Sequence, residues 1–168
     1  AEIRVDSTGN VRLLAGTHNH GQGHQTTYAQ IIADRLGLPY DGVTVVEGDT
    51  ESVPMGTGTF GSRSIAVGGS AIAVAADKIV QKGRQLAAYL MEAAEEDVTF
   101  TNGVYAISGT DRSMTISEIA NAANLGHVMP PGMEPGLNES AFYDPSNFAY
   151  SNGGHVVEIE VDRDTGEI

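Results

Sequence analysis

Two glycine-rich loops hold the residues whose types and spacing could do chemistry. The first loop, residues 18–24, leads directly into an apolar-periodic, helix-like run. A turn that opens into a helix points backbone N–H groups and the helix dipole at an anion such as phosphate. Gly21 and Gly23 let the backbone approach a ligand. Gln22 offers a donor and an acceptor, and Thr26 lies in the first helical turn, so the loop predicts an anion cradle.

The second loop, residues 56–64, is also a glycine-rich turn that leads into a helix, in this case a longer one. Ser62, Arg63 and Ser64 stand at the N-terminal edge of that run, where hydroxyls, a guanidinium and free N–H groups can converge on a pyrophosphate. A structural alternative for Arg63 is a bond to a buried carboxylate. Together the two loops predict one extended, multiply charged ligand.

The histidines of the first loop permit a different interpretation. His18, His20 and His24 could supply nitrogen ligands to zinc, with Asp49 or Glu51 as an oxygen ligand. No helix-based zinc hydrolase motif accompanies them. We therefore expect hydrogen-bonded histidines around a polar pocket, and no metal site, with a histidine-based metal hydrolase as the alternative.

Composition limits the class of partner. The 168 residues include 9 basic and 22 acidic side chains, for a net charge of −13, which argues against nucleic acid or an anionic membrane surface. The absence of cysteine excludes disulfides and thiolate metal ligands within the chain.

The apolar stretch over residues 65–80 is broken by Gly68, Asp77 and Lys78, so no membrane insertion is predicted. No secretory signal is visible, and we expect a cytoplasmic protein.

The first half of the chain reads as a β-β-α-β unit. Residues 3–6 and 11–15 alternate apolar and polar side chains around a turn, which predicts a hairpin. Apolar residues recur at helical spacing up to Leu36, and Gly37 supplies a C-terminal stop. The β-branched run over residues 43–47 predicts a buried strand.

The second half adds a long helix, a hairpin and less regular segments. The helix is expected from Ser64 to about Ala94, with a bend near Gly83 left open. The remaining expectations are a hairpin over residues 98–107 around Asn102-Gly103, a short helix over 118–123 capped by Thr115 or Ser117, an irregular excursion over 124–147, and a strand over 156–162 followed by a turn at 164–168. Because a returning strand does not follow that turn, we expect a piece of a longer polypeptide, or a chain that completes its sheet with another.

Four motifs in order support a resemblance. They cover residues 21–26, 47–50, 56–64 and 150–155, and together they resemble the molybdenum hydroxylases, the large subunits of the xanthine dehydrogenase, aldehyde oxidase and aerobic carbon monoxide dehydrogenase family. The resemblance implies that residues 1–168 form one molybdopterin-binding subdomain, the first of two, within a longer chain. The implied fold class is α+β: a two-layer sandwich whose mixed or antiparallel sheet carries helices on one face, with a β-β-α-β-α core and an added hairpin.

The resemblance also implies a cofactor and the residues that bind it. The cofactor is molybdopterin, as its cytosine dinucleotide in most bacterial members, and Gln22 matches a loop glutamine whose amide lies beside the molybdenum oxo group. The implied cofactor-binding residues are Gly21, Gln22, Gly23, His24, Thr26, Phe60, Gly61, Ser62 and Arg63.

The implied reaction is the hydroxylation of an aldehyde or N-heterocycle, or the oxidation of carbon monoxide, with oxygen from water. Electrons then pass through iron–sulfur clusters to FAD on partner subunits or domains. The family's general base, a glutamate in a Gly-x-Gly-Glu context, does not occur in the chain, so we expect no catalytic residue and no activity in isolation. The alternative function is a non-catalytic α+β module that binds a phosphate or nucleotide.

Overall fold

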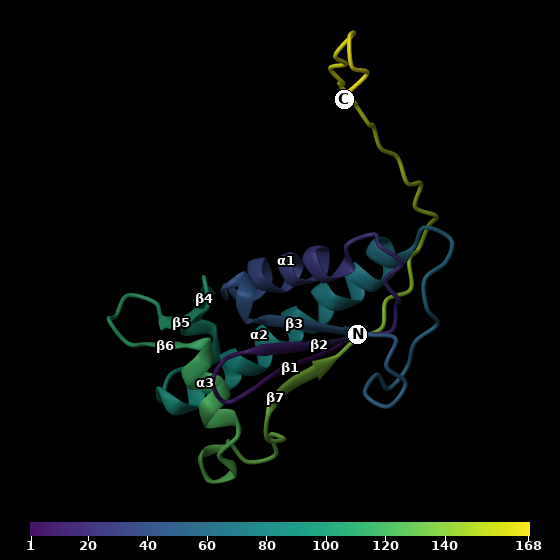
Figure 1. The fold of residues 1–168 in the computed structure, drawn as a ribbon. Coiled ribbons are helices and arrows are strands. Elements are labelled where there is room, and N and C mark those ends of the chain that lie inside the picture. The colour runs from purple at the N-terminus through teal and green to yellow at the C-terminus, as the bar shows by residue number, and fades with distance from the viewer.

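The computed structural model describes all 168 residues and is built around a mixed sheet of four strands (Figure 1). Strand β3 runs parallel to β2, while β1 is antiparallel to both of its neighbours, β2 and β7. The order is β3-β2-β1-β7, with bounds Glu2–Val5 (β1), Val11–Ala15 (β2), Val43–Glu47 (β3) and Leu137–Ser140 (β7). The predicted β-β-α-β unit and α+β fold class are confirmed.

Two helices, α1 (His24–Leu36) and α2 (Ser70–Leu90), cover one face of this sheet (Figure 1). Ile3 and Leu13 from the sheet meet Ile32 and Ile79 from the helices in the core, all without solvent exposure. Burial of each such side chain stabilises the fold by about 1.5–3 kcal/mol. Gly37 ends α1 in the left-handed conformation, as predicted.

The long helix differs from the sequence-based expectation. It begins as a π-helical turn at Ser64–Gly69, continues without interruption through Gly83 and ends at Leu90, so no break occurs at that glycine. Gly83 instead allows close packing, because a Cβ there would lie 2.1 Å from the hydroxyl oxygen of Tyr105.

Residues Ser64–Leu90 are long and apolar enough to cross a membrane by length and composition. In this fold, however, α2 packs against α1, β1 and β7, and its apolar side chains enter the core. The segment therefore acts here as the central helix of a packed domain.

The predicted hairpin forms the second sheet. Strands β4 (Val98–Thr101) and β5 (Val104–Ile107) pair around Asn102 and Gly103, which both adopt positive φ. A short third strand, β6 (Ser113–Thr115), was missed. It leads into α3 (Ile116–Ala123), where Thr115 and Glu118 form a reciprocal capping box, so Thr115 is the cap.

Two expectations for the C-terminal third are wrong. The excursion over residues 124–147 is not wholly irregular, because β7 lies within it and pairs along the whole of β1. Residues 156–162 form no strand: they extend away from the body (Figure 1), with Val157 83% exposed. Alternation alone does not make a strand, since the backbone needs a partner strand and none lies beside this segment here. The turn after it does form, with the Gly166 amide donating to Asp162 at 2.8 Å.

Candidate functional site

The two glycine-rich loops meet at the end of the main sheet and line one cleft. The cleft has a volume of about 740 Å³, within the range of roughly 300–1,000 Å³ typical of ligand pockets. Only one of its nine lining residues is hydrophobic. The lining comprises His20, Gln22, His24 and Thr27 from the first loop and α1, Thr59, Ser62, Ser64 and Ile65 from the second loop and its helix, and Ser151.

The first loop owes its shape to its two glycines. Gly21 has φ 98° and Gly23 has φ 77°, a left-handed conformation that favours glycine. A Cβ at either position would meet no atom within 4 Å, so the space beside both is open. No side chain caps the N-terminus of α1, and its first N–H groups are therefore free to bind a ligand.

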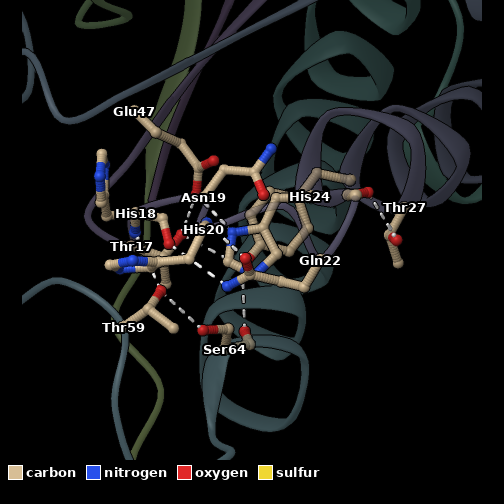
Figure 2. A network of polar contacts seen from close by, with 12 residues as sticks. Thr17, His18, Asn19, His20, Gln22, His24, Thr27, Glu47, Thr59 and Ser64 are labelled. Atoms are coloured by element: carbon tan, nitrogen blue, oxygen red, sulfur yellow. Dashed lines mark hydrogen bonds and ion pairs between the residues drawn. The ribbon is translucent and has the colours of Figure 1, made fainter.

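The Gln22 side chain is folded against its own loop. Its Oε1 accepts a hydrogen bond from the His20 amide, and its Nε2 donates to the His18 carbonyl at 3.4 Å. The Asn19 carboxamide oxygen accepts from the Gly21 amide at 3.0 Å. These bonds order an exposed loop and hold the Gln22 carboxamide at the cleft (Figure 2).

His24 and Glu47 form a buried pair beside the cleft. The His24 Nδ1 lies 2.9 Å from Oε1 of Glu47, and both side chains are only 6% exposed. The Thr17 hydroxyl donates to the same carboxylate oxygen and lies 3.1 Å from the Tyr28 hydroxyl. The ends of β2 and β3 are thus tied to the first turns of α1.

The same network continues to the second loop (Figure 2). The Tyr28 hydroxyl donates to the Ser64 carbonyl at 3.1 Å, and the Ser64 hydroxyl lies 2.9 Å from that of Thr59. Thr59 in turn accepts from the His18 amide at 3.0 Å. Burial raises the pKa of Tyr28 above its ordinary value of 10.0, although the hydrogen bond with Thr17 opposes this. Tyr28 therefore remains a neutral donor between the two loops.

The second loop is fixed by backbone contacts and by an aromatic contact. The Gly16 carbonyl accepts from the amides of Thr57 and Gly58, both at 3.0 Å. The Arg63 guanidinium carbon lies 5.2 Å from the centre of the Phe60 ring, a cation–π geometry. Arg63 makes no ion pair, so the alternative in which it binds a buried carboxylate is wrong.

The predicted binding residues fall into two groups. Gln22, His24 and Ser62 line the main cleft. Ser62 also lines an adjacent pocket together with Phe60, Gly61 and Arg63. Ser62 itself has φ 53°, unusual for a residue with a side chain.

Thr26 does not line the cleft, although its neighbour does. Its side chain is exposed, whereas the Thr27 hydroxyl reaches the cleft and donates to the Gly23 carbonyl at 3.0 Å. Consecutive residues on a helix point about 100° apart, so the side chains of Thr26 and Thr27 face different directions. Thr59 also lines the cleft and was missed, whereas Ser64, predicted with Ser62 and Arg63 at the start of the second helical run, lines it as well.

The other candidate metal ligands make different contacts. No group of three or more histidine, aspartate or glutamate side chains is arranged to hold a metal ion. The His18 and His20 rings pack edge to face at 4.6 Å. Asp49 accepts from the Glu51 amide at 2.9 Å within its own turn, and its hydrogen bonds, the one with Ser52 foremost, lower its pKa.

The fold and the cleft together define a class of protein: a two-layer α+β domain in which two glycine-rich loops line one polar cleft. The family model of the molybdopterin cofactor-binding domain matches residues 1–168 of the chain. The chain belongs to that family. The resemblance to molybdenum hydroxylase large subunits is confirmed.

Individual relatives agree with this assignment. The chain is 46% identical to the carbon monoxide dehydrogenase large chain of Hydrogenophaga pseudoflava, over 99% of its own length and 20% of the relative's. It is 38% identical to the nicotine 6-hydroxylase large subunit of Paenarthrobacter nicotinovorans, over 99% and 21% of the two lengths. Among solved structures, reconstituted CO dehydrogenase from Oligotropha carboxidovorans superposes with a TM-score of 0.82 at 44% identity, over 87% of this chain and 18% of that one. The chain thus spans about one fifth of the length of its relatives.

Proposed function

We propose that this chain forms one wall of the molybdopterin site in a molybdenum-dependent hydroxylase or dehydrogenase, and that the cofactor is the cytosine dinucleotide form. The observation that carries the proposal is the convergence of two glycine-rich loops on one polar cleft, in a chain of the molybdopterin-binding family. A dinucleotide cofactor is long and carries a pyrophosphate, which suits a cleft lined from two separate loops.

The residues present fit such a cofactor. The open space beside Gly21 and Gly23 admits a ligand against the backbone, and the uncapped start of α1 offers N–H groups to a phosphate. In this proposal Thr26 contributes its backbone amide, while the Thr27 hydroxyl and the Gln22 carboxamide face the ligand. Phe60, Gly61, Ser62 and Arg63 line the continuation of the cleft.

The reaction proposed for the complete protein is the oxidation of an aldehyde, an N-heterocycle or carbon monoxide in the cytoplasm, with water as the oxygen source. The bound cofactor would supply the two-electron redox chemistry, and iron–sulfur and FAD partners would accept the electrons. The present chain would bind and orient the cofactor and exclude water around it. Because it contains no Gly-x-Gly-Glu sequence, we propose that it has no activity alone.

The proposal is tested by the cofactor content of the full-length subunit. We expect stoichiometric molybdenum, together with stoichiometric cytidine monophosphate after acid hydrolysis of the dinucleotide. Gln22→Glu should deplete both, because a carboxylate in the cleft repels phosphate. Gln30→Glu adds the same charge to an exposed position of α1 outside the cleft, away from the start of the helix, and serves as the matched control. A wild-type subunit without molybdenum, or equal contents in the two variants, would contradict the proposal.

A further inference from the structure

The His24 ring is held on two sides and keeps one nitrogen free of contacts within the protein. Its Nδ1 lies 2.9 Å from Oε1 of Glu47, and its face stacks on Tyr28 with ring centres 4.8 Å apart and planes at 23°. Turning the ring over would break the contact with Glu47. The direction of the second ring nitrogen, Nε2, is therefore fixed.

The Nε2 atom lies on the edge of the ring that reaches the cleft. His24 lines the cleft although only 5% of the residue is exposed. Nε2 makes no hydrogen bond within the protein, and it is not one of the two fully buried side-chain atoms that lack a partner, Arg84 Nε and the Tyr105 hydroxyl. An unpartnered nitrogen on a buried, oriented ring is the arrangement expected of a group that meets a ligand.

Glu47 determines which nitrogen of the ring carries the proton. Its Oε1 accepts the Thr17 hydroxyl and also faces Nδ1 of His24, so this oxygen acts as an acceptor (Figure 2). Nδ1 therefore carries a proton and donates it to Glu47. One proton satisfies the observed contact, and in a neutral imidazole the other nitrogen is then an acceptor. The ring thus presents the lone pair of Nε2 to the cleft.

The rest of the cleft lining is polar and includes no lysine, arginine, aspartate or glutamate. Most of its other polar groups are hydroxyls, which can turn to donate or to accept. The oriented His24 nitrogen cannot adapt in this way. At this point the cleft therefore selects for a hydrogen-bond donor and disfavours an anionic oxygen. The hydroxyl groups belong to Thr27, Thr59, Ser62, Ser64 and Ser151.

We propose that Nε2 of His24 accepts a hydrogen bond from an N–H or O–H group of the ligand bound in the cleft, and that Glu47 is a positioning residue that keeps this nitrogen an acceptor. The inference rests on the proposed function, in which the ligand is a molybdopterin dinucleotide. Such a ligand carries N–H groups on its pterin ring and N–H and O–H groups on its cytidine part. Its phosphates would be met by the free backbone N–H groups at the start of α1, and not by this ring edge.

Two substitutions of His24 separate the roles of its two nitrogens. In His24→Asn the carboxamide nitrogen lies near the position of Nδ1, so a donor to Glu47 is kept and the acceptor at the cleft is lost. In His24→Gln the carboxamide oxygen can reach the position of Nε2, so the acceptor is restored and the contact with Glu47 is lost. His127→Asn is the matched control, because His127 is exposed and does not line the cleft.

The first measurement is the rate at which the purified full-length subunit releases molybdenum and its cytidine-containing cofactor. We expect release from His24→Asn to be about two- to tenfold faster than from wild type, the range for loss of one hydrogen bond between neutral groups. His24→Gln should recover most of this loss, and His127→Asn should match wild type. Thermal unfolding of each variant identifies any that has failed to fold.

The second measurement is the nitrogen NMR signal of His24 Nε2 in the full-length subunit with isotope-labelled histidine, assigned by its loss in either His24 variant. When the cofactor is bound, the signal should shift toward that of a protonated nitrogen, because its lone pair accepts a hydrogen bond, while Nδ1 keeps its proton. A residue that only supports the fold would give the same signal with and without cofactor. In Glu47→Gln, whose carboxamide can donate as well as accept, part of the Nδ1 proton should move to Nε2.

A subunit loaded with molybdopterin that lacks the cytidine monophosphate part identifies the donor. If His24→Asn also speeds the release of this shorter form, the donor is an N–H group of the pterin. If it speeds the release of the dinucleotide alone, the donor lies on the cytidine part. Either result supports the inference.

Equal release from His24→Asn and wild type would overturn the inference. An Nε2 signal that is the same with and without cofactor would do so whatever the release rates, and so would a fully protonated Nε2 in the loaded wild type. An Nδ1 that stays fully protonated in Glu47→Gln would overturn the positioning role. A wild-type subunit that lacks molybdenum and cytidine monophosphate overturns the proposed function as well, whereas bound cofactor that is insensitive to His24 overturns this inference alone.

Discussion

The backbones of Gly16 and Gly56 touch, and this contact joins the second loop to the end of β2. A Cβ on Gly56 would lie 2.6 Å from the Gly16 carbonyl oxygen, and one on Gly16 would lie 2.5 Å from the Met55 carbonyl oxygen. The same Gly16 carbonyl accepts the amides of Thr57 and Gly58. The second loop can therefore reach the cleft only because neither position carries a side chain.

Gly56→Ala should weaken both the fold and the cleft. The added methyl group meets backbone atoms that cannot rotate away, so we expect the free energy of unfolding to fall by about 1–3 kcal/mol, as for overpacked sites. Urea unfolding of the two proteins measures this change. Gly126→Ala is the matched control, since no atom lies within 4 Å of its Cβ position. Equal effects of the two substitutions would show that the contact is not a tight one.

Tyr105→Phe should leave the stability unchanged or raise it by about 1 kcal/mol, because it removes a buried hydroxyl that has no hydrogen-bond partner. Tyr28→Phe provides the contrast: it removes a hydroxyl that donates to the Ser64 carbonyl, and should cost about 1 kcal/mol. Urea midpoints give both values. A clear loss of stability in Tyr105→Phe would mean that its hydroxyl has a partner, such as a bound water molecule.

The free energy of unfolding should decline at alkaline pH because these two buried tyrosines resist ionisation in the folded state. Burial raises the pKa of Tyr28 and of Tyr105 above the ordinary value of 10.0. Above about pH 10 a tyrosine in the unfolded chain loses its proton while the folded one keeps it, so the unfolded state is favoured. The contribution of the two protonated tyrosines to the free energy of unfolding is complete below the pKa of tyrosine in the unfolded chain. It is lost as pH rises through the higher pKa of the folded state.

Urea unfolding midpoints measured between about pH 8 and about pH 11 test whether the stability falls as pH rises. The midpoint should fall with pH in the wild type and fall less steeply in Tyr105→Phe. A decline of equal steepness in both proteins would place its origin elsewhere.

Thr115→Ala should cost about 0.5–2 kcal/mol, the usual effect of losing an N-cap. Thr115 and Glu118 bond reciprocally, and the Thr115 amide lowers the pKa of Glu118. This part of the stability is present above the ordinary glutamate pKa and is lost as pH falls through the lowered one. Ser117→Ala is the control, because the Glu118 amide donates to the Thr115 hydroxyl and not to Ser117. Equal losses in the two variants, measured by thermal unfolding, would contradict the capping assignment.

Much of the fold could be predicted because its elements are locally encoded. The helix α1 has both an apolar period and a glycine stop, and the Asn102-Gly103 turn specifies its hairpin. Strand β7 carries no such pattern: only Leu137 of its four residues is buried, and its pairing with β1 joins segments more than 130 residues apart. The strand expected over residues 156–162 has the opposite problem, a clear pattern without a partner strand.

In the candidate site, too, the locally encoded features could be predicted from the sequence and the contacts between distant residues could not. Gln22 and Ser62, which line the cleft, were selected as candidates because glycine loops before helices are recognisable in sequence. The bond between His24 and Glu47 was not, because it joins a helix to a strand end 23 residues away. Thr27 was missed because a helix start must be known to within one residue before the direction of its side chains can be assigned.

The most direct test of the central claim is an experimental structure of the complete subunit with its cofactor bound. Our account predicts density for a molybdopterin dinucleotide in the cleft, in contact with Gln22 of the first loop and Ser62 of the second, with a phosphate near the start of α1. A structure that holds the cofactor elsewhere, with this cleft filled by other parts of the polypeptide, would contradict it.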